Sequence, residues 1–74
     1  MLLRMATLKE LRLEAGYSYA ELSRRANVSE PTVKRAEMGD PIQEVKAAQI
    51  ARALSEALGR RVSISDIDGL NIYQ

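Results

Sequence analysis

Two pairs of adjacent cations are the side chains with the clearest chemical potential in this sequence. Arg24 and Arg25 form one pair, and Lys34 and Arg35 form the other. Adjacent cations suit an anion, and an Arg can pair bidentately with a phosphate or with the O6/N7 edge of guanine. Residues 24–39 hold four Lys or Arg against two Glu, whereas residues 40–74 hold four against five Asp or Glu. The positive part of the chain therefore coincides with these pairs.

The chain offers little to a catalytic or metal site. It has 74 residues, with no Cys and no His. Their absence excludes disulfides, thiolate metal sites and the commonest general base. The hydroxyls of Ser63 and Ser65 and the carboxylates of Asp66 and Asp68 have no base, oxyanion site or metal cluster to work with. We therefore expect no enzyme activity, no cofactor and no metal.

Composition indicates a single globular domain over residues 1–74, with a core at 7–67 and a tail at 68–74. Apolar residues make up 46% of the chain and charged residues 28%, a mixture typical of folded domains. No apolar stretch is long enough to span a membrane, and residues 1–5 are too short for a signal peptide. We expect a cytoplasmic protein that does not enter membranes.

Helix start and stop signals divide the chain into five short helices, an all-α fold. A hydroxyl followed three residues later by a carboxylate forms a capping box at Thr7 and again at Ser18. Proline in the first turn marks two further starts. The helices are expected to begin at the caps Thr7, Ser18, Ser29, Asp40 and Ser63, and the first four end at Gly16, Asn27, Gly39 and Gly59.

Apolar residues recur at helical spacing and predict the buried faces. The residues at this spacing are Leu8, Leu11, Ala15, Leu22, Ala26, Val33, Ala36, Val45, Ala48 (or Gln49), Ala51 (or Arg52), Ile50, Leu54 and Leu58. No strand is predicted. The apolar residues of the tail, Leu70, Ile72 and Tyr73, either cover the domain's own core or form a dimer contact, and we favour the first.

The second and third predicted helices are joined by a short turn, which is the pattern of a helix-turn-helix. Small residues at Ala20, Ser23 and Ala26 let the two helices cross closely. One face of the third helix is apolar, and the opposite face carries Glu30, Pro31, Lys34, Arg35 and Met38. A helix that projects in this way fits the width of the DNA major groove.

The run Val28-Ser29-x-x-Thr32-Val33-x-Arg35-x-Glu37-x-Gly39 resembles the helix-turn-helix of the lambdoid phage repressor and Cro family, also called Xre-like. The resemblance covers roughly residues 7–67, including residues 50–54, which are similar to the family's fourth helix. It implies a compact five-helix lambda-repressor-like DNA-binding domain in which helices 2 and 3 form the helix-turn-helix.

The resemblance also implies roles for single residues. The helix around 29–38 docks in the major groove, where Glu30, Pro31, Lys34 and Arg35 read base edges. Arg35 is the best candidate for a bidentate contact to guanine, and Lys34 is also a candidate for a phosphate contact. Phosphate contacts are expected from Ser18, Tyr19, Arg24, Arg25 and Thr32. Arg12 and Glu37 match positions that form a structural ion pair in the family. The sequence departs from the usual pattern at Tyr19, where Gln is common, and at Pro31, Asn27 and Ser23.

The expected function is that of a sequence-specific double-stranded DNA-binding transcriptional regulator. A phage or mobile-element repressor and an antitoxin are both compatible with the sequence, and a homodimer on an approximately palindromic operator is expected. The alternative is a protein–protein interaction module on the same fold, with weak or no DNA binding. The net charge of +1 and the position of Glu30 favour that alternative.

Overall fold

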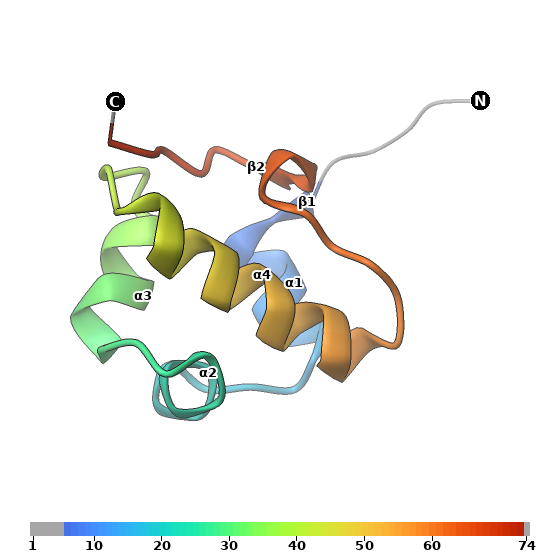
Figure 1. Cartoon of the computed structure of the whole chain (residues 1–74). Coiled ribbons are helices and arrows are strands. Elements are labelled where there is room, and N and C mark those ends of the chain that lie inside the picture. The colour runs from blue at the N-terminus through green and yellow to red at the C-terminus, as the bar shows by residue number, and fades with distance from the viewer. Residues whose placement is uncertain (1–5, 74) are drawn as a thin grey trace.

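Four α-helices surround one apolar core in the computed structural model of this chain, which describes residues 6–73. Residues 1–5 and Gln74, part of the expected domain and tail, lie outside the described residues. The helices are α1 (Leu8–Glu14), α2 (Tyr19–Ala26), α3 (Glu30–Glu37) and α4 (Glu44–Leu58). Figure 1 shows α4 passing across the middle of the molecule, with α2 beneath it and α3 at one end.

The core lies where α2 packs against the long helix α4 and against α3. Leu22, Val33, Ile50 and Leu54 are fully buried there. Most of the expected core residues are buried or packed against the core. Val45, which is 70% exposed, and Ala48, which is also exposed, are errors of the prediction. The inward face of α4 instead follows residues 47, 50, 51 and 54, which leaves position 45 on the opposite side.

The predicted helix starts at Thr7, Ser18 and Ser29 are confirmed, with one difference in detail. Thr7 forms a full capping box with Glu10. The hydroxyl of Ser18 accepts a hydrogen bond from the Glu21 amide, but the Glu21 carboxylate is turned toward arginines and does not complete the box. Asn27 ends α2 in the left-handed conformation, with φ at 58°, which Asn tolerates better than most residues.

The expectation of five helices and an all-α fold is corrected by the structure. The segment expected to open the fourth helix at Pro41 is extended, and α4 begins only at Glu44. The reason is non-local: the amide of Ile42 donates to the carbonyl of Asn71, and the carbonyl of Ile42 accepts from the amide of Tyr73. Those backbone groups are thereby withdrawn from a helix. The fifth element is a single 3₁₀ turn, Ile64–Asp66.

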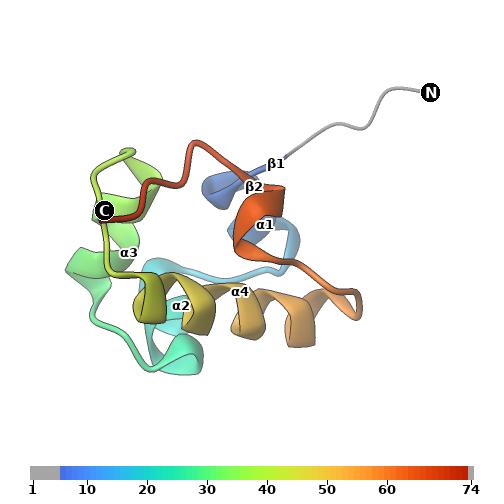
Figure 2. The same cartoon turned by 45° about the horizontal axis from the view of Figure 1, so that its top comes forward.

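Two very short strands pair in parallel near the chain ends. They are β1 (Ala6–Thr7) and β2 (Ile67–Asp68), in the register Ala6 opposite Ile67. The tail then crosses to the connection between α3 and α4, as Figures 1 and 2 both show. Leu70 and Ile72 pack against the core, which confirms self-packing for these two residues. Tyr73, in contrast, is 55% exposed.

An ion pair between Arg12 of α1 and Glu37 of α3 fastens the helix-turn-helix to the first helix. The Nε atom of Arg12 donates to Glu37 at 2.6 Å and Nη2 donates to the other carboxylate oxygen at 3.4 Å, while Nη1 donates to the carbonyl of Tyr17 at 2.9 Å. The side chains are only 8% and 6% exposed. The hydrogen bonds to Glu37 raise the pKa of Arg12 further, so its charge is retained. The expected structural ion pair is thus present.

Loss of the Glu37 carboxylate should be severe. Glu37→Ala leaves Arg12 buried without its partner, which should cost about 3–5 kcal/mol of the free energy of unfolding. Glu37→Gln keeps one acceptor and should cost less. Urea unfolding at neutral pH measures both. The control is Glu14→Ala, which breaks the exposed pair with Arg60. If Glu37→Ala were no more destabilising than this control, the pair would not hold the fold together.

Candidate nucleic-acid interface

The helix α3 has one face in the core and one face in solvent. Val33 and Ala36 are buried, which fixes the rotation of the helix about its own axis. The four residues expected to read bases all lie on the solvent side and are exposed: Glu30, Pro31, Lys34 and Arg35. Pro31 lies in the first turn, where its missing N–H leaves no hydrogen bond unmade. The structure thus places these residues together on one exposed surface, the α3 face.

Tyr19, which is expected to contact phosphate, contacts both the ion pair of Arg12 with Glu37 and Lys34 of the α3 face. Its ring centroid lies 4.2 Å from the guanidinium carbon of Arg12 and 5.4 Å from the ammonium nitrogen of Lys34. The hydroxyl of Tyr19 donates to Glu37 at 3.4 Å. Two cations share one ring, and cations are attracted to the ring face. Tyr19 therefore positions Lys34, and its hydroxyl is turned toward the protein.

The other uncharged phosphate candidates lie at helix starts. The Ser18 hydroxyl caps α2 by accepting from Glu21 at 3.1 Å. Its own hydrogen has no acceptor within the described part of the chain, so it is available to a ligand. The Thr32 hydroxyl lies 2.8 Å from that of Ser29, the cap of α3. The Thr32 hydroxyl is therefore held at the start of α3 by Ser29, and the Ser18 hydroxyl is the more available of the two to a ligand.

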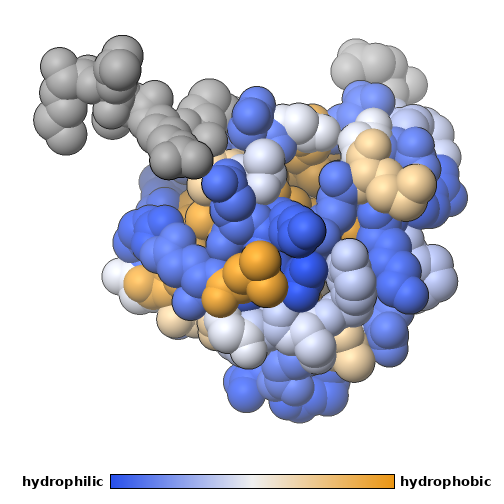
Figure 3. Space-filling view, turned by 180° about the vertical axis from the view of Figure 1, so that it is seen from behind, coloured by the Kyte–Doolittle hydropathy of each residue, from blue (hydrophilic) through white to orange (hydrophobic). Residues whose placement is uncertain are grey.

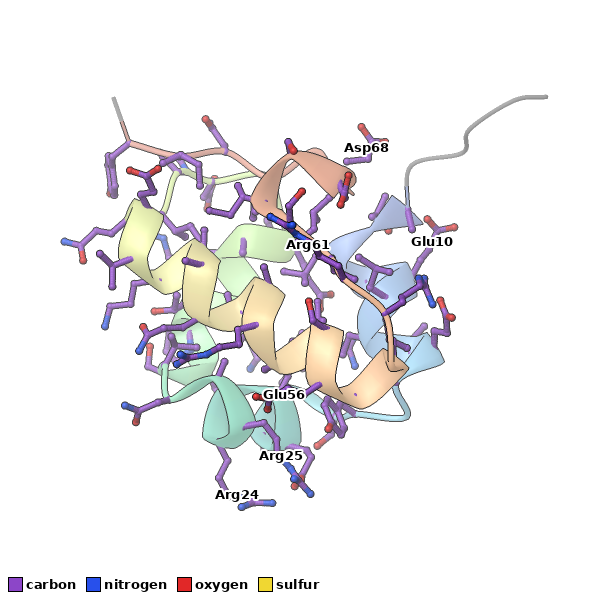
Figure 4. All side chains as sticks on the ribbon, turned by 45° about the vertical axis from the view of Figure 1, so that its right-hand side comes forward. Glu10, Arg24, Arg25, Glu56, Arg61 and Asp68 are labelled. Carbon is purple, nitrogen blue, oxygen red and sulfur yellow. The ribbon has the colours of Figure 1, made fainter. Side chains whose placement is uncertain are left out.

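Arg24 and Arg25 are both engaged by one carboxylate. Arg24 donates to Glu21 at 2.6 Å and Arg25 donates to the same oxygen at 2.7 Å. These bonds, from Arg25 and then Arg24, hold the pKa of Glu21 below its usual range. Arg25 also lies 5.8 Å from the centroid of the Tyr17 ring. Figure 4 shows both arginines projecting from α2 on the side of the molecule opposite the tail, with Glu56 nearby. One carboxylate thus offsets half of their charge.

A surface hollow beside α3 was not expected from the sequence. It measures about 250 Å³ and lies between the end of α3, the start of α4 and the tail. The lining residues that matter here are Thr32, Arg35, Pro41, Lys46 and Tyr73. Tyr73 lies 38 positions after Arg35 in the sequence, so no local pattern could have connected the two residues. Lys46 could have been assigned to the lining of this hollow only if the start of α4 at Glu44 were known.

The surface away from the α3 face includes a second hollow of about 310 Å³ beside α4, whose lining includes Ala51, Arg52 and Arg61. Seen from behind, the surface of the molecule is largely hydrophilic, with apolar side chains in small separate areas (Figure 3). Over residues 6–73, no group of acidic side chains is arranged to hold a metal ion. None of the described helices is long and apolar enough to cross a membrane.

Comparison with known proteins agrees with this geometry. The family model described as helix-turn-helix matches residues 8–67. No curated protein and no solved structure matches the chain. The matched range contains α1 to α4 and the ion pair between Arg12 and Glu37. Because the match covers most of the chain, this protein belongs to the Xre and lambda-repressor-like helix-turn-helix family, a family of DNA-binding regulators.

Proposed function

We propose that this protein is a sequence-specific regulator of transcription that inserts α3 into the major groove of double-stranded DNA. The observation that carries the proposal is the two-sided character of α3. Its inner face is locked into the core by Val33 and Ala36, and its outer face presents Glu30, Pro31 and Lys34 to solvent. A helix held rigidly on one side can present the same side chains to base edges in each encounter.

The chemistry of the α3 face is compatible with base readout. Glu30 can accept from the N4 amino group of cytosine, and the Pro31 ring can contact the methyl group of thymine. Lys34 can donate to the acceptors of guanine, and its position over Tyr19 restricts its freedom. Arg35 lies on the same face, but Pro41 and Tyr73 accept hydrogen bonds from its guanidinium.

Phosphate contacts in this proposal come mainly from the start of α2 and from α3. The hydroxyl of Ser18 and the backbone amide of Tyr19 lie where a helix N-terminus favours an anion. Thr32 is a further donor. Arg24 and Arg25 each use one nitrogen on Glu21. Their other donors can contact phosphate, and their exposure of 67% and 53% allows that.

Two copies of the chain would give such a small reader enough contacts for an operator. We propose a homodimer on an approximately palindromic site, with half-sites about 34 Å apart, one helical turn of DNA. Acting by occupancy, it would serve as a phage or mobile-element repressor or as an antitoxin, in the cytoplasm.

A protein-interaction module on the same fold is the second candidate. The specific observation in its favour is electrostatic: Glu21 offsets the charge of Arg24 and Arg25, and Glu30 adds a negative charge to the α3 face. Both features weaken attraction to DNA. The two functions differ in the salt dependence of DNA binding, which is steep for a protein that contacts several phosphates.

Selection from a randomised duplex pool tests the proposed function directly. We expect the purified full chain at moderate salt to enrich one motif, with two-fold symmetry if it binds as a dimer. An unpaired half-site would contradict the dimer but not the reading of sequence. No enrichment from protein that is folded by circular dichroism would overturn the proposal and favour the interaction module.

Glu30→Gln tests the assignment of the first residue of α3. Removal of the negative charge should strengthen binding to random DNA, because phosphate repulsion is reduced. At the same time, discrimination at one C·G pair should fall by about 1–3 kcal/mol. Titrations on the selected operator and on its single-base variants measure both effects. A uniform gain on every sequence would mean that Glu30 repels the backbone and reads no base.

Arg24→Ala tests whether this arginine contacts a phosphate. A phosphate contact predicts weaker binding to operator and random DNA alike, with the slope of log affinity against log salt shallower by about one. Arg60→Ala is the matched control, because Arg60 is an exposed arginine held by Glu14 of α1, outside the helix-turn-helix. Equal slopes for Arg24→Ala and Arg60→Ala would remove Arg24 from the interface.

A further inference from the structure

The guanidinium of Arg35 is held by the tail of the chain. Its Nη2 atom donates to the hydroxyl of Tyr73 at 3.3 Å and to the carbonyl of Pro41 at 3.4 Å. Both acceptors lie toward the end of α3 that leads into α4. The guanidinium is thereby drawn away from the start of α3, where Glu30 and Pro31 lie.

Tyr73 is in place because the tail is firmly attached. The amide of Tyr73 donates to the carbonyl of Ile42 at 3.0 Å, and the amide of Ile42 donates to the carbonyl of Asn71 at 3.0 Å. The side chain of Asn71 reaches the carbonyl of Gly39 at 3.4 Å. Ile72 packs against the core. The hydroxyl of Tyr73 is thus presented to Arg35 by a backbone that is fixed on the connection between α3 and α4.

The nitrogen that Tyr73 binds is the one that bidentate recognition requires. An arginine offers two parallel N–H donors in two ways, either from Nε and Nη2 or from Nη1 and Nη2. This molecule shows both: Arg12 uses Nε and Nη2 on Glu37, and Arg60 uses Nη1 and Nη2 on Glu14. Nη2 is common to the two arrangements. In Arg35 this nitrogen donates to two protein acceptors, so each pair of donors includes a nitrogen that is already engaged.

We propose that Tyr73 is a specificity-determining residue, which competes with guanine for Nη2 of Arg35 and so weakens the preference of this protein for guanine at one position of its site. The inference rests on the proposed function. Guanine is read bidentately by arginine through O6 and N7. Such a contact forms here only after Arg35 gives up Tyr73 or Pro41, and the discrimination is reduced by the strength of the bond that is lost.

The competing bonds are modest, which sets the size of the effect. Distances of 3.3 and 3.4 Å are longer than the usual range for such bonds, and both lie at the surface. They do not abolish reading by Arg35. Release of one of them should change discrimination at that base pair by about two- to fivefold, the range that a hydrogen bond in solvent contributes.

Tyr73→Phe is the direct test, since it removes the hydroxyl and keeps the ring. The variant should select the same operator with a preference for guanine about two- to fivefold stronger at a single position, and the other positions should not change. Tyr17→Phe is the matched control, because the hydroxyl of Tyr17 has no hydrogen-bond partner within the described residues and the substitution removes the same atom. Thermal unfolding should show the same stability for both variants.

The role of Arg35 as the intermediary is tested by combining substitutions. In an Arg35→Ala background, Tyr73→Phe should have no effect on base preference. An equal effect with and without Arg35, or identical motifs for wild type and Tyr73→Phe, would overturn the inference. A purely structural role of Tyr73 would weaken binding to all sequences alike, which also contradicts it.

The contact can be measured without DNA, which separates this inference from the proposed function. In ¹⁵N-labelled protein, the side-chain signals of Arg35 should shift in Tyr73→Phe and stay in place in Tyr17→Phe. Unshifted signals would show that the hydrogen bond between Arg35 and Tyr73 does not form in solution and would overturn the inference. If the signals shift but the wild type enriches no sequence, the proposed function fails, and the consequence for reading fails with it.

Discussion

The orientation of the exposed helix α3 depends on a single buried carboxylate. Glu37 closes the last turn of α3 against Arg12 of α1, and Tyr19 from the first turn of α2 lies over the same guanidinium. Arg12 also binds the carbonyl of Tyr17 in the connection before α2. Three helices and one connection therefore meet at one charge. A buried ion pair adds little net stability over an apolar contact, but its geometry is directional. It fixes the angle at which α3 is presented.

Local signals in the sequence were sufficient for most of the helices and for the α3 face. Hydroxyl caps, the apolar spacing of Leu22, Val33 and Leu54, and Asn27 at the turn all act within a few residues, so they can be read without the fold. The extended backbone at Ile42, the two-residue strands and the position of Tyr73 could not be predicted. The first and the last depend on the return of the tail to Ile42, thirty residues before Ile72, and the strands pair Ala6 with Ile67, 61 residues away. Pairings of that kind leave no periodic pattern when only two residues take part.

Several cations near the α3 face are paired with carboxylates of the protein. Arg12 is committed to Glu37, and Arg24 and Arg25 share Glu21. Lys34 and Arg35 are cations of this region that form no ion pair with a carboxylate among the described residues. Lys34 is held over Tyr19, and Arg35 donates to Pro41 and Tyr73. A reader with few free cations gains little from the non-specific attraction of the phosphate backbone. Discrimination must then come from the fit of the α3 face to base edges, which requires that α3 be rigid.

Different residues of the tail contribute to the stability of the fold and to the proposed reading of DNA bases. Leu70 and Ile72 cover the core, and the backbone pairing with Ile42 fixes the segment in place. The side chain of Tyr73 does not have to pack into the core to be held in position, because Leu70, Ile72 and the backbone pairing with Ile42 supply the free energy that fixes the tail. A change at position 73 can therefore alter the freedom of Arg35 without a cost to folding, whereas a change at Ile72 would affect both. Variation at an exposed residue of a fixed tail segment is a route by which a domain of this size can change its specificity while its core stays the same.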